Sequence, residues 1–153
     1  MTDAQGGQVP RPVRSLGIAG QDRHGLGILD EATCMRLIEH ERIGRLGVTD
    51  SNGPLILPIN YLLHDGRIVF RSADGAKARA AAQGAVGCLE VDRFDRFEHT
   101  GWSVLATGRL SVVSPEYSDA YERLPVVPWA VHGESRFYEL SIERVSGRVL
   151  RLL

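Results

Sequence analysis

Three strand-like segments follow one another between residues 42 and 72, and only tight turns separate them. The segments read RIGRLGVT, PLILPINYLL and RIVFRS, and the turns between them contain the Asx- and Gly-rich stretches DSNG and HDG. Parallel strands need a crossover connection of roughly a dozen residues or more, and this stretch contains none. The three segments are therefore predicted to pair as an antiparallel sheet, and a doubly wound parallel fold is disfavoured.

A later segment, WSVLATGRLSVV, shows the clearest alternation in the chain. One parity holds Trp102, Val104, Ala106, Leu110 and Val112, and the other holds Ser103, Thr107, Arg109 and Ser111. Because successive side chains of a strand point to opposite faces, this pattern predicts a strand with one buried side. Its other side is expected to face water or a ligand.

The remaining periodic segments complete a chain dominated by strands. Helices are predicted over residues 29–41, with Asp30 as N-cap, over 74–83, and over 114–124, with Pro115 at the first position. Further strands are predicted over 85–92 and 136–145. The order is helix, three strands, helix, two strands, helix, strand. We expect a mainly β fold with some α, an antiparallel barrel whose openings are covered by short helices.

The first 27 residues are rich in Gly, Pro and Gln and show little apolar periodicity. We interpret residues 1–27 as a flexible tail, or as an arm that packs on the surface late, and residues 28–153 as one folded domain. The net charge of −1 disfavours nucleic acid or an anionic membrane as the partner of the whole chain. The chain has no apolar run of membrane-spanning length, and we expect a cytoplasmic protein.

The common catalytic and metal-binding signatures are missing. GLGI is half of a dinucleotide fingerprint, GWSVL lacks the second glycine of a serine-hydrolase elbow, and the histidines are scattered. Cys34 and Cys88 match no metal or redox spacing and are expected to be packed, reduced thiols. The stretch DRFDRFEH is interpreted as a loop that tucks Phe94 and Phe97 against the body of the protein or a partner subunit.

Three cations surround the start of the helix predicted over residues 74–83. Arg71 precedes it, Lys77 lies in its first turn and Arg79 follows, while Ser72 or Asp74 can cap it. Cations at this end of a helix cost a few tenths of a kcal/mol each, so acids are usually found there. Two interpretations remain open: the cations bind a phosphate group, or they are solvated and Asp74 relieves their repulsion.

Five motifs come in the order and spacing of a known family: LPINYLL, IVFRSADGAKARA, GCLEVDRF, GWSVLATGRLSVV and IERVSGR. Over about residues 29–148 the chain resembles the pyridoxamine phosphate oxidase-like flavin-binding proteins, particularly the small branch that includes the nitroimidazole-resistance type. The resemblance implies a split β-barrel, generally a homodimer with FMN in a cleft between the subunits. Such a dimer would also bury Phe94, Phe97 and Trp129.

The resemblance also implies a set of cofactor-binding residues. Pro58, Ile59, Asn60 and Tyr61 would lie along the isoalloxazine ring, Phe70, Arg71 and Ser72 would line the ribityl-phosphate side, Lys77 would contact the phosphate, and Ser103, with Trp102 beside it, would reach the flavin.

The chain departs from the family pattern at three places. Ala76 stands where a basic residue is common, and Arg71 stands where the resistance-type branch often has a histidine. The substrate motif of true pyridoxamine phosphate oxidases is absent from the C-terminal stretch RVSGRVLRLL. We therefore expect an FMN-dependent oxidoreductase acting on an unknown small molecule, with no side chain assigned as acid or base. The alternatives are a deazaflavin-dependent reductase and a non-catalytic flavin- or haem-binding carrier or sensor.

Overall fold

The computed structural model describes residues 16–73, 75–128 and 134–151. Its elements are, in chain order, β1 (Ile18–Gln21), β2 (Gly27–Leu29), α1 (Glu31–His40), β3 (Ile43–Asp50), β4 (Gly53–His64), β5 (Arg67–Ser72), α2 (Ala76–Ala82), β6 (Val86–Asp95), β7 (Thr100–Val112), the 3₁₀ turn η2 (Pro115–Tyr117), α3 (Ser118–Tyr121) and β8 (Arg136–Arg151).

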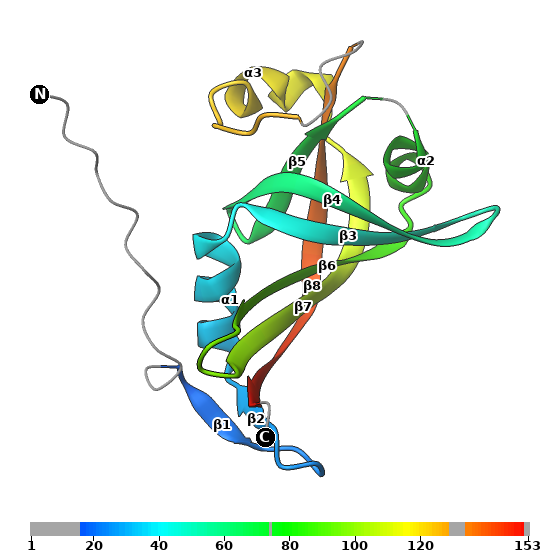
Figure 1. The fold of residues 1–153 in the computed structure, drawn as a ribbon. Coiled ribbons are helices and arrows are strands. Elements are labelled where there is room, and N and C mark those ends of the chain that lie inside the picture. Colours follow the sequence, from blue (N-terminus) through cyan, green and yellow to red (C-terminus); the bar gives the residue numbers. More distant parts are fainter. Residues whose placement is uncertain (1–15, 74, 129–133, 152–153) are drawn as a thin grey trace, which may run out of the picture.

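The strands form one antiparallel sheet that closes on itself (Figure 1). The order is β1-β2-β8-β5-β4-β3-β6-β7, and an additional pairing of β7 with β8 joins the two ends of the last six strands. These six strands are therefore a barrel, and closure leaves their ladders few free edges. The mainly antiparallel barrel with short helices that the sequence predicts is confirmed.

The last strand, β8, holds this barrel together. It pairs with β5 through Arg136–Ser141 and with β2 through Gly147–Val149 on one edge, and with β7 along its other edge. The ladder with β7 contains a bulge at Thr107/Gly108. A Cβ at Gly108 would collide with the carbonyl group of Ser141, so glycine permits the close approach of the two strands.

Residues 1–27 are expected from the sequence to form a flexible tail, but the second half of this range contains regular structure. Ile18–Gln21 and Gly27–Leu29 form a hairpin that extends the sheet beyond β8, and Asp22 forms an ion pair with Arg148 at 3.1 Å. Strands of three or four residues are too short to show a period of two, and β8, the strand that holds β2 to the sheet, lies more than a hundred residues away in the sequence. Residues 1–15 lie outside the described residues.

Helices α1 and α2 pack onto the apolar interior of the barrel. Asp30 caps α1 as predicted, because its carboxylate accepts a hydrogen bond from the Thr33 amide at 2.7 Å. Cys34 and Ile38 of α1 belong to the same buried cluster as Ala80 and Ala81 of α2. No helix within the described ranges is long and apolar enough to cross a membrane.

A buried tyrosine connects α1 to the barrel. The hydroxyl group of Tyr61 on β4 donates to the carbonyl of Ile38 at 2.7 Å, in the last turn of α1, where carbonyls lack helical partners. Burial raises the pKa of Tyr61 well above its usual value. Replacing Tyr61 with Phe is expected to lower the free energy of unfolding by about 1–3 kcal/mol, because a buried carbonyl loses its donor.

Urea denaturation would measure this loss against a matched control. Tyr117 is exposed on η2, and removing its hydroxyl group should change stability very little. If Tyr61→Phe costs no more than Tyr117→Phe, the hydrogen bond to Ile38 does not stabilise the fold.

Candidate functional site

Residues 115–128, here called the cap, cover the outer face of β4, β5 and β8. The cap contains η2, α3 and the segment that follows, and it lies at the end of the barrel where α2 is also found (Figure 1). A second buried cluster, separate from the barrel interior, fixes it in place. This cluster consists of Leu62, Val69, Val126 and Phe137, with Val113, Tyr121 and Leu124 packed against it.

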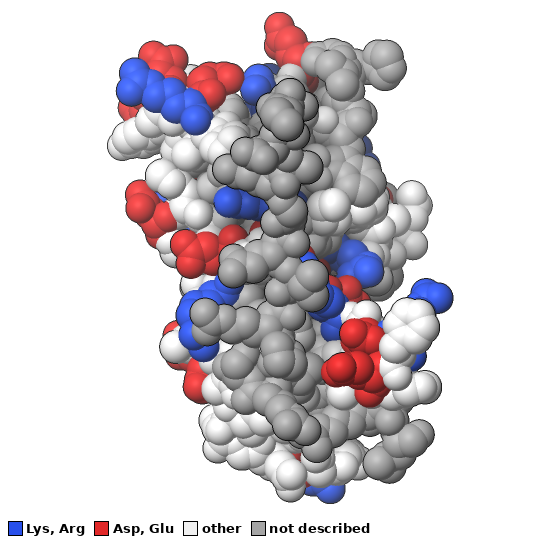
Figure 2. All heavy atoms as spheres, turned by 60° about the vertical axis from the view of Figure 1, so that its left-hand side comes forward, with Lys and Arg blue, Asp and Glu red and all other residues white. Residues whose placement is uncertain are grey.

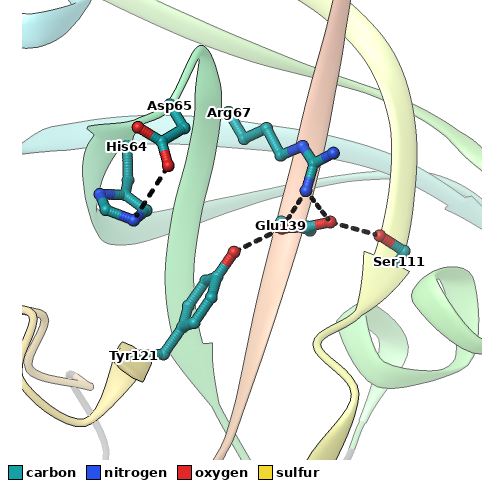
Figure 3. Close-up of polar contacts among 6 residues, drawn as sticks. All are labelled: His64, Asp65, Arg67, Ser111, Tyr121 and Glu139. Atoms are coloured by element: carbon teal, nitrogen blue, oxygen red, sulfur yellow. Dashed lines mark hydrogen bonds and ion pairs between the residues drawn. The ribbon is translucent and has the colours of Figure 1, made fainter. Parts of the chain in front are cut away.

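A polar network on the same face anchors α3 to β8. The carboxylate of Glu139 accepts hydrogen bonds from the Tyr121 hydroxyl at 3.0 Å, from Arg67 at 3.2 Å and from the Ser111 hydroxyl at 3.4 Å (Figure 3). Only 13% of the Glu139 side chain is exposed. Burial, together with Glu139, raises the pKa of Tyr121. Because the carboxylate is engaged on several sides, Glu139 serves to hold α3 in place.

Arg71, predicted to line the phosphate side of the cofactor, makes a second anchor for the cap. Its two terminal nitrogens contact the two carboxylate oxygens of Glu122, both at 3.2 Å. Its Nε donates to the Ser135 hydroxyl at 2.8 Å, and its guanidinium carbon lies 4.8 Å from the centre of the Phe137 ring. The side chain thus points to the outer face of β5, under the cap.

The four residues predicted to run along the isoalloxazine ring alternate between the two faces of β4. Pro58 is exposed and Asn60 is half-buried on the outer face, whereas Ile59 and Tyr61 are buried in the barrel interior. The Asn60 side chain donates to the Val127 carbonyl of the cap at 3.0 Å. Side-chain contacts with a ligand outside the barrel are therefore open to Pro58 and Asn60, while Ile59 and Tyr61 can contribute only backbone groups.

Phe70 and Ser72 point the opposite way from Arg71. Phe70 is fully buried and stacks on Tyr138, with ring centres 5.6 Å apart. The Ser72 hydroxyl donates to the Ala73 carbonyl at 3.1 Å, and the N-cap of α2 is Gly75, without a side-chain cap. Capping by Ser72 is therefore wrong, and Asp74, the other candidate cap, lies outside the described residues.

Lys77 in α2 differs from the two cations near it in sequence. It is half-buried, and burial lowers its pKa. Among the described residues, the contacts found for Lys77 include no carboxylate, whereas Arg71 contacts Glu122 and exposed Arg79 lies 3.9 Å from Asp50. A half-buried ammonium group without an anion is a candidate for binding one, because desolvated charges are stable only when paired.

Trp102 and Ser103 lie far from the other predicted residues. In the closed barrel two strands separate β7 from β4 in either direction, so the two strands are on opposite sides. Leu110 of β7 lies near the end of α2, because its amide donates to the carbonyl of Ala85. Ser103 is seven residues from Leu110 along the same strand, which is roughly 24 Å at the rise of a strand. The Trp102 side chain is buried in the core, and Ser103 is half-buried on the outer face opposite Asp92.

The outer surface of β4, β3, β6 and β7 carries four exposed apolar side chains, Ile43, Ile56, Val86 and Leu105. We call this surface the open face. Ile56 is the most exposed of the four, at 72%. Exposed apolar side chains gathered on one face are typical of an interface.

A charged group lies among the four apolar residues of the open face, because Arg45 pairs with Glu90 and Glu90 pairs with Leu105 across neighbouring strands. Arg45 contacts Glu90 at 2.8 Å and Asp92 at 3.1 Å, so one guanidinium serves two carboxylates. Burial, followed by the charge of Asp92, raises the pKa of Glu90. The group of Arg45, Glu90 and Asp92 contains two acids and one base.

The hairpin tip between β6 and β7 was expected to tuck its two phenylalanines against the body or a partner subunit. Phe94 is half exposed, and a Cβ at Gly101 would collide with its ring. Phe97 is 96% exposed, so it does not pack against the body of its own chain. Trp129, the third aromatic residue of that prediction, lies outside the described residues.

The surface seen in Figure 2 carries acids and bases side by side, without a broad field of one sign among the described residues. Within the described ranges, no group of three or more His, Cys, Asp and Glu side chains is arranged to hold a metal ion. A hollow of about 260 Å³ lies beside the β1–β2 hairpin and is lined by residues such as Ile18, Leu26 and Val149. It lies at the end of β8 away from the cap, where Val149 pairs with Trp102 of β7.

Sequence reasoning missed the residues that hold the cap. Glu122, Glu139 and Val127 contact predicted cofactor residues or their neighbours, yet they lie 51 to 72 positions away in the sequence. The only local signal in the sequence was the alternation of apolar and polar side chains in the strand that contains Glu139.

Two comparisons identify relatives of the chain. The pyridoxamine 5'-phosphate oxidase family profile matches residues 30–149. The uncharacterised protein Rv0080 of Mycobacterium tuberculosis is 35% identical over 125 residues, which cover 78% of this chain and 82% of that protein. The match includes β4, β5 and β7, which contain the predicted site residues, and the whole barrel except the last residues of β8.

Solved structures share the fold. The FAD-binding protein of Mycobacterium smegmatis superimposes with a TM-score of 0.70 and 28% identity, covering 82% of this chain and 99% of that one. A structure named as a 5-nitroimidazole antibiotic resistance protein of Bacteroides thetaiotaomicron gives a TM-score of 0.64 at 14% identity, covering 82% and 89% of the two chains. At that identity the second likeness concerns the fold alone.

Proposed function

Because the chain belongs to the pyridoxamine 5'-phosphate oxidase family, we propose that it is a flavin-dependent oxidoreductase that binds FMN between two copies of itself. We assign this function to residues 28–153. A family relative of the same fold binds FAD, which supports a flavin as the ligand. The free thiols of Cys34 and Cys88 suit a reducing compartment, and we place the protein in the cytoplasm.

The observation that carries this proposal is the dispersal of the predicted site residues over one barrel. Pro58 and Asn60 lie on β4, Ser103 lies on β7, and Lys77 lies on α2, which packs on β7 and β3. In the closed barrel two strands separate β4 from β7 in either direction. A second copy docked on the open face would bring residues of both chains to one ligand and would cover Ile56 and Leu105, which are exposed in the single chain.

Lys77 fits the phosphate end of a flavin nucleotide. It is half-buried without a described carboxylate partner, so a phosphate would supply the counter-charge that its burial requires. The pairing of β4 with β5 begins at Tyr61, so Pro58–Asn60 pair with β3 alone. The isoalloxazine ring, when bound, supplies the redox chemistry, and the protein binds it, orients it and sets its electrostatic surroundings.

Cofactor binding can be tested on the purified protein. FMN at a hundredfold excess over its dissociation constant is expected to stabilise the fold by about 2.7 kcal/mol, measured as a rise in melting temperature. Absorption in the flavin bands, and release of the chromophore on denaturation, identify whether FMN, FAD, a deazaflavin or haem is bound. Bleaching of the bound flavin by reduced nicotinamide distinguishes an oxidoreductase from a carrier. A melting temperature that responds to none of these ligands would exclude the proposal.

A further inference from the structure

The guanidinium group of Arg71 is positioned by contacts that do not involve the cap. Ser135 accepts from its Nε at 2.8 Å, and the Phe137 ring lies against its face at 4.8 Å. Ser135 immediately precedes β8 and Phe137 lies at its start, so both are outside residues 115–128. Arg71 would therefore keep its place if Glu122 moved away, and its two terminal nitrogens would be free to bind another anion.

Glu122 is the more easily displaced partner of the pair. Its side chain is 51% exposed, against 27% for Arg71. Both of its contacts measure 3.2 Å, which is longer than the roughly 2.7–2.9 Å typical of strong charge-assisted hydrogen bonds. A phosphate group carries more charge than a carboxylate, and its three oxygens can accept hydrogen bonds from the same planar guanidinium group.

A second predicted cofactor residue also holds the cap. The Asn60 side chain donates to the Val127 carbonyl at 3.0 Å, six residues beyond the end of α3. Asn60 and Arg71, on β4 and β5, are therefore both occupied by cap atoms. A ligand that engaged their side chains would compete with the cap for them.

We propose that Glu122 is a built-in competitor for the phosphate of the cofactor: it closes the cap over Arg71 and is displaced when the phosphate binds. The inference rests on the proposed function. The network around Glu139 includes Tyr121, which precedes Glu122 in the sequence, and it keeps α3 attached while the rest of the cap opens. Opening is driven by a phosphate-bearing flavin, and riboflavin does not drive it.

The test compares Glu122→Gln with Glu116→Gln. Each removes one negative charge from the cap, but Glu116 is exposed and contacts Ser114 instead of Arg71. Affinities for FMN and riboflavin are measured by flavin fluorescence, and hydrogen exchange is followed in peptides that cover residues 115–128. Glu122→Gln is expected to tighten FMN binding about two- to fivefold relative to riboflavin, the range of a partly exposed ion pair.

Glu116→Gln should leave the ratio of FMN to riboflavin affinity unchanged. In the wild-type protein, FMN should speed hydrogen exchange in the cap and riboflavin should not. If flavin binds the wild type but Glu122→Gln leaves the ratio at the value of Glu116→Gln, the competitor role of Glu122 is wrong and the proposed function stands. If neither the wild type nor Glu122→Gln binds any flavin, both proposals fail.

Discussion

Replacing Lys77 with Ala is expected to weaken FMN binding about ten- to a hundredfold while leaving riboflavin binding nearly unchanged. The substitution removes one charge-assisted hydrogen bond to the phosphate, worth about 1.5–3 kcal/mol. Riboflavin has the same ring without the phosphate, so it never makes this bond. The apo protein should not lose stability, because it no longer buries an ammonium group whose pKa is lowered by burial.

Arg79→Ala is the matched control for this change. It removes a positive charge from the same helix, two residues further on, but Arg79 is exposed and lies 3.9 Å from Asp50. Its effect on FMN should therefore be small and sensitive to salt. Titration of both variants with FMN and riboflavin decides between the two interpretations of the cation cluster. If Lys77→Ala weakens both ligands equally, or affects FMN no more than Arg79→Ala does, Lys77 does not bind the phosphate.

The strands of the barrel could be predicted because their signals are local. The turn between β4 and β5 contains Asp65 at φ 48° and Gly66 at φ 73°, the Asp-Gly chemistry that favours a tight hairpin. Apolar alternation then fixes which side chains face inward, as for Trp102 and Val104 on β7. Neither signal needs information from distant parts of the chain.

The cation cluster shows what local signals cannot supply. In the sequence Arg71, Lys77 and Arg79 form one group, but the fold gives them three environments. Arg71 is on the outer face of a strand and pairs with Glu122, 51 residues away, while Arg79 faces Asp50 of β3. Lys77 forms an ion pair with neither Glu122 nor Asp50. An ion pair between distant segments depends on the whole packing, so no pattern around residue 71 could have revealed it.

The division of the cofactor residues between β4 and β7 was equally invisible in the sequence. The family resemblance places Pro58 and Ser103 at one flavin, yet closure of the barrel sets them on opposite sides of one chain. That closure arises because β8 pairs with β5 on one edge and with β7 on the other. Strand order is a property of the sheet, and the alternation within a strand does not encode it.

If two copies complete the site, Ile56→Glu is expected to disrupt both the dimer and FMN binding. Ile56 is 72% exposed in the single chain, so glutamate there should change the stability of the monomer by no more than about 0.5 kcal/mol. In the dimer the same carboxylate would be buried without a partner, at a cost of roughly 3–5 kcal/mol. The dissociation constant of the dimer should therefore rise at least about a hundredfold.

Ile18→Glu provides the control, because Ile18 is an exposed isoleucine on β1, outside the open face. Sedimentation of the two variants at micromolar concentration should give a monomer for Ile56→Glu and the wild-type mass for Ile18→Glu. FMN affinity should fall with the loss of the dimer and recover as the concentration of Ile56→Glu is raised, since mass action restores the shared site. A wild-type protein that binds FMN as a monomer, or an Ile56→Glu dimer as stable as the wild type, would show that the open face is not the surface that completes the flavin site.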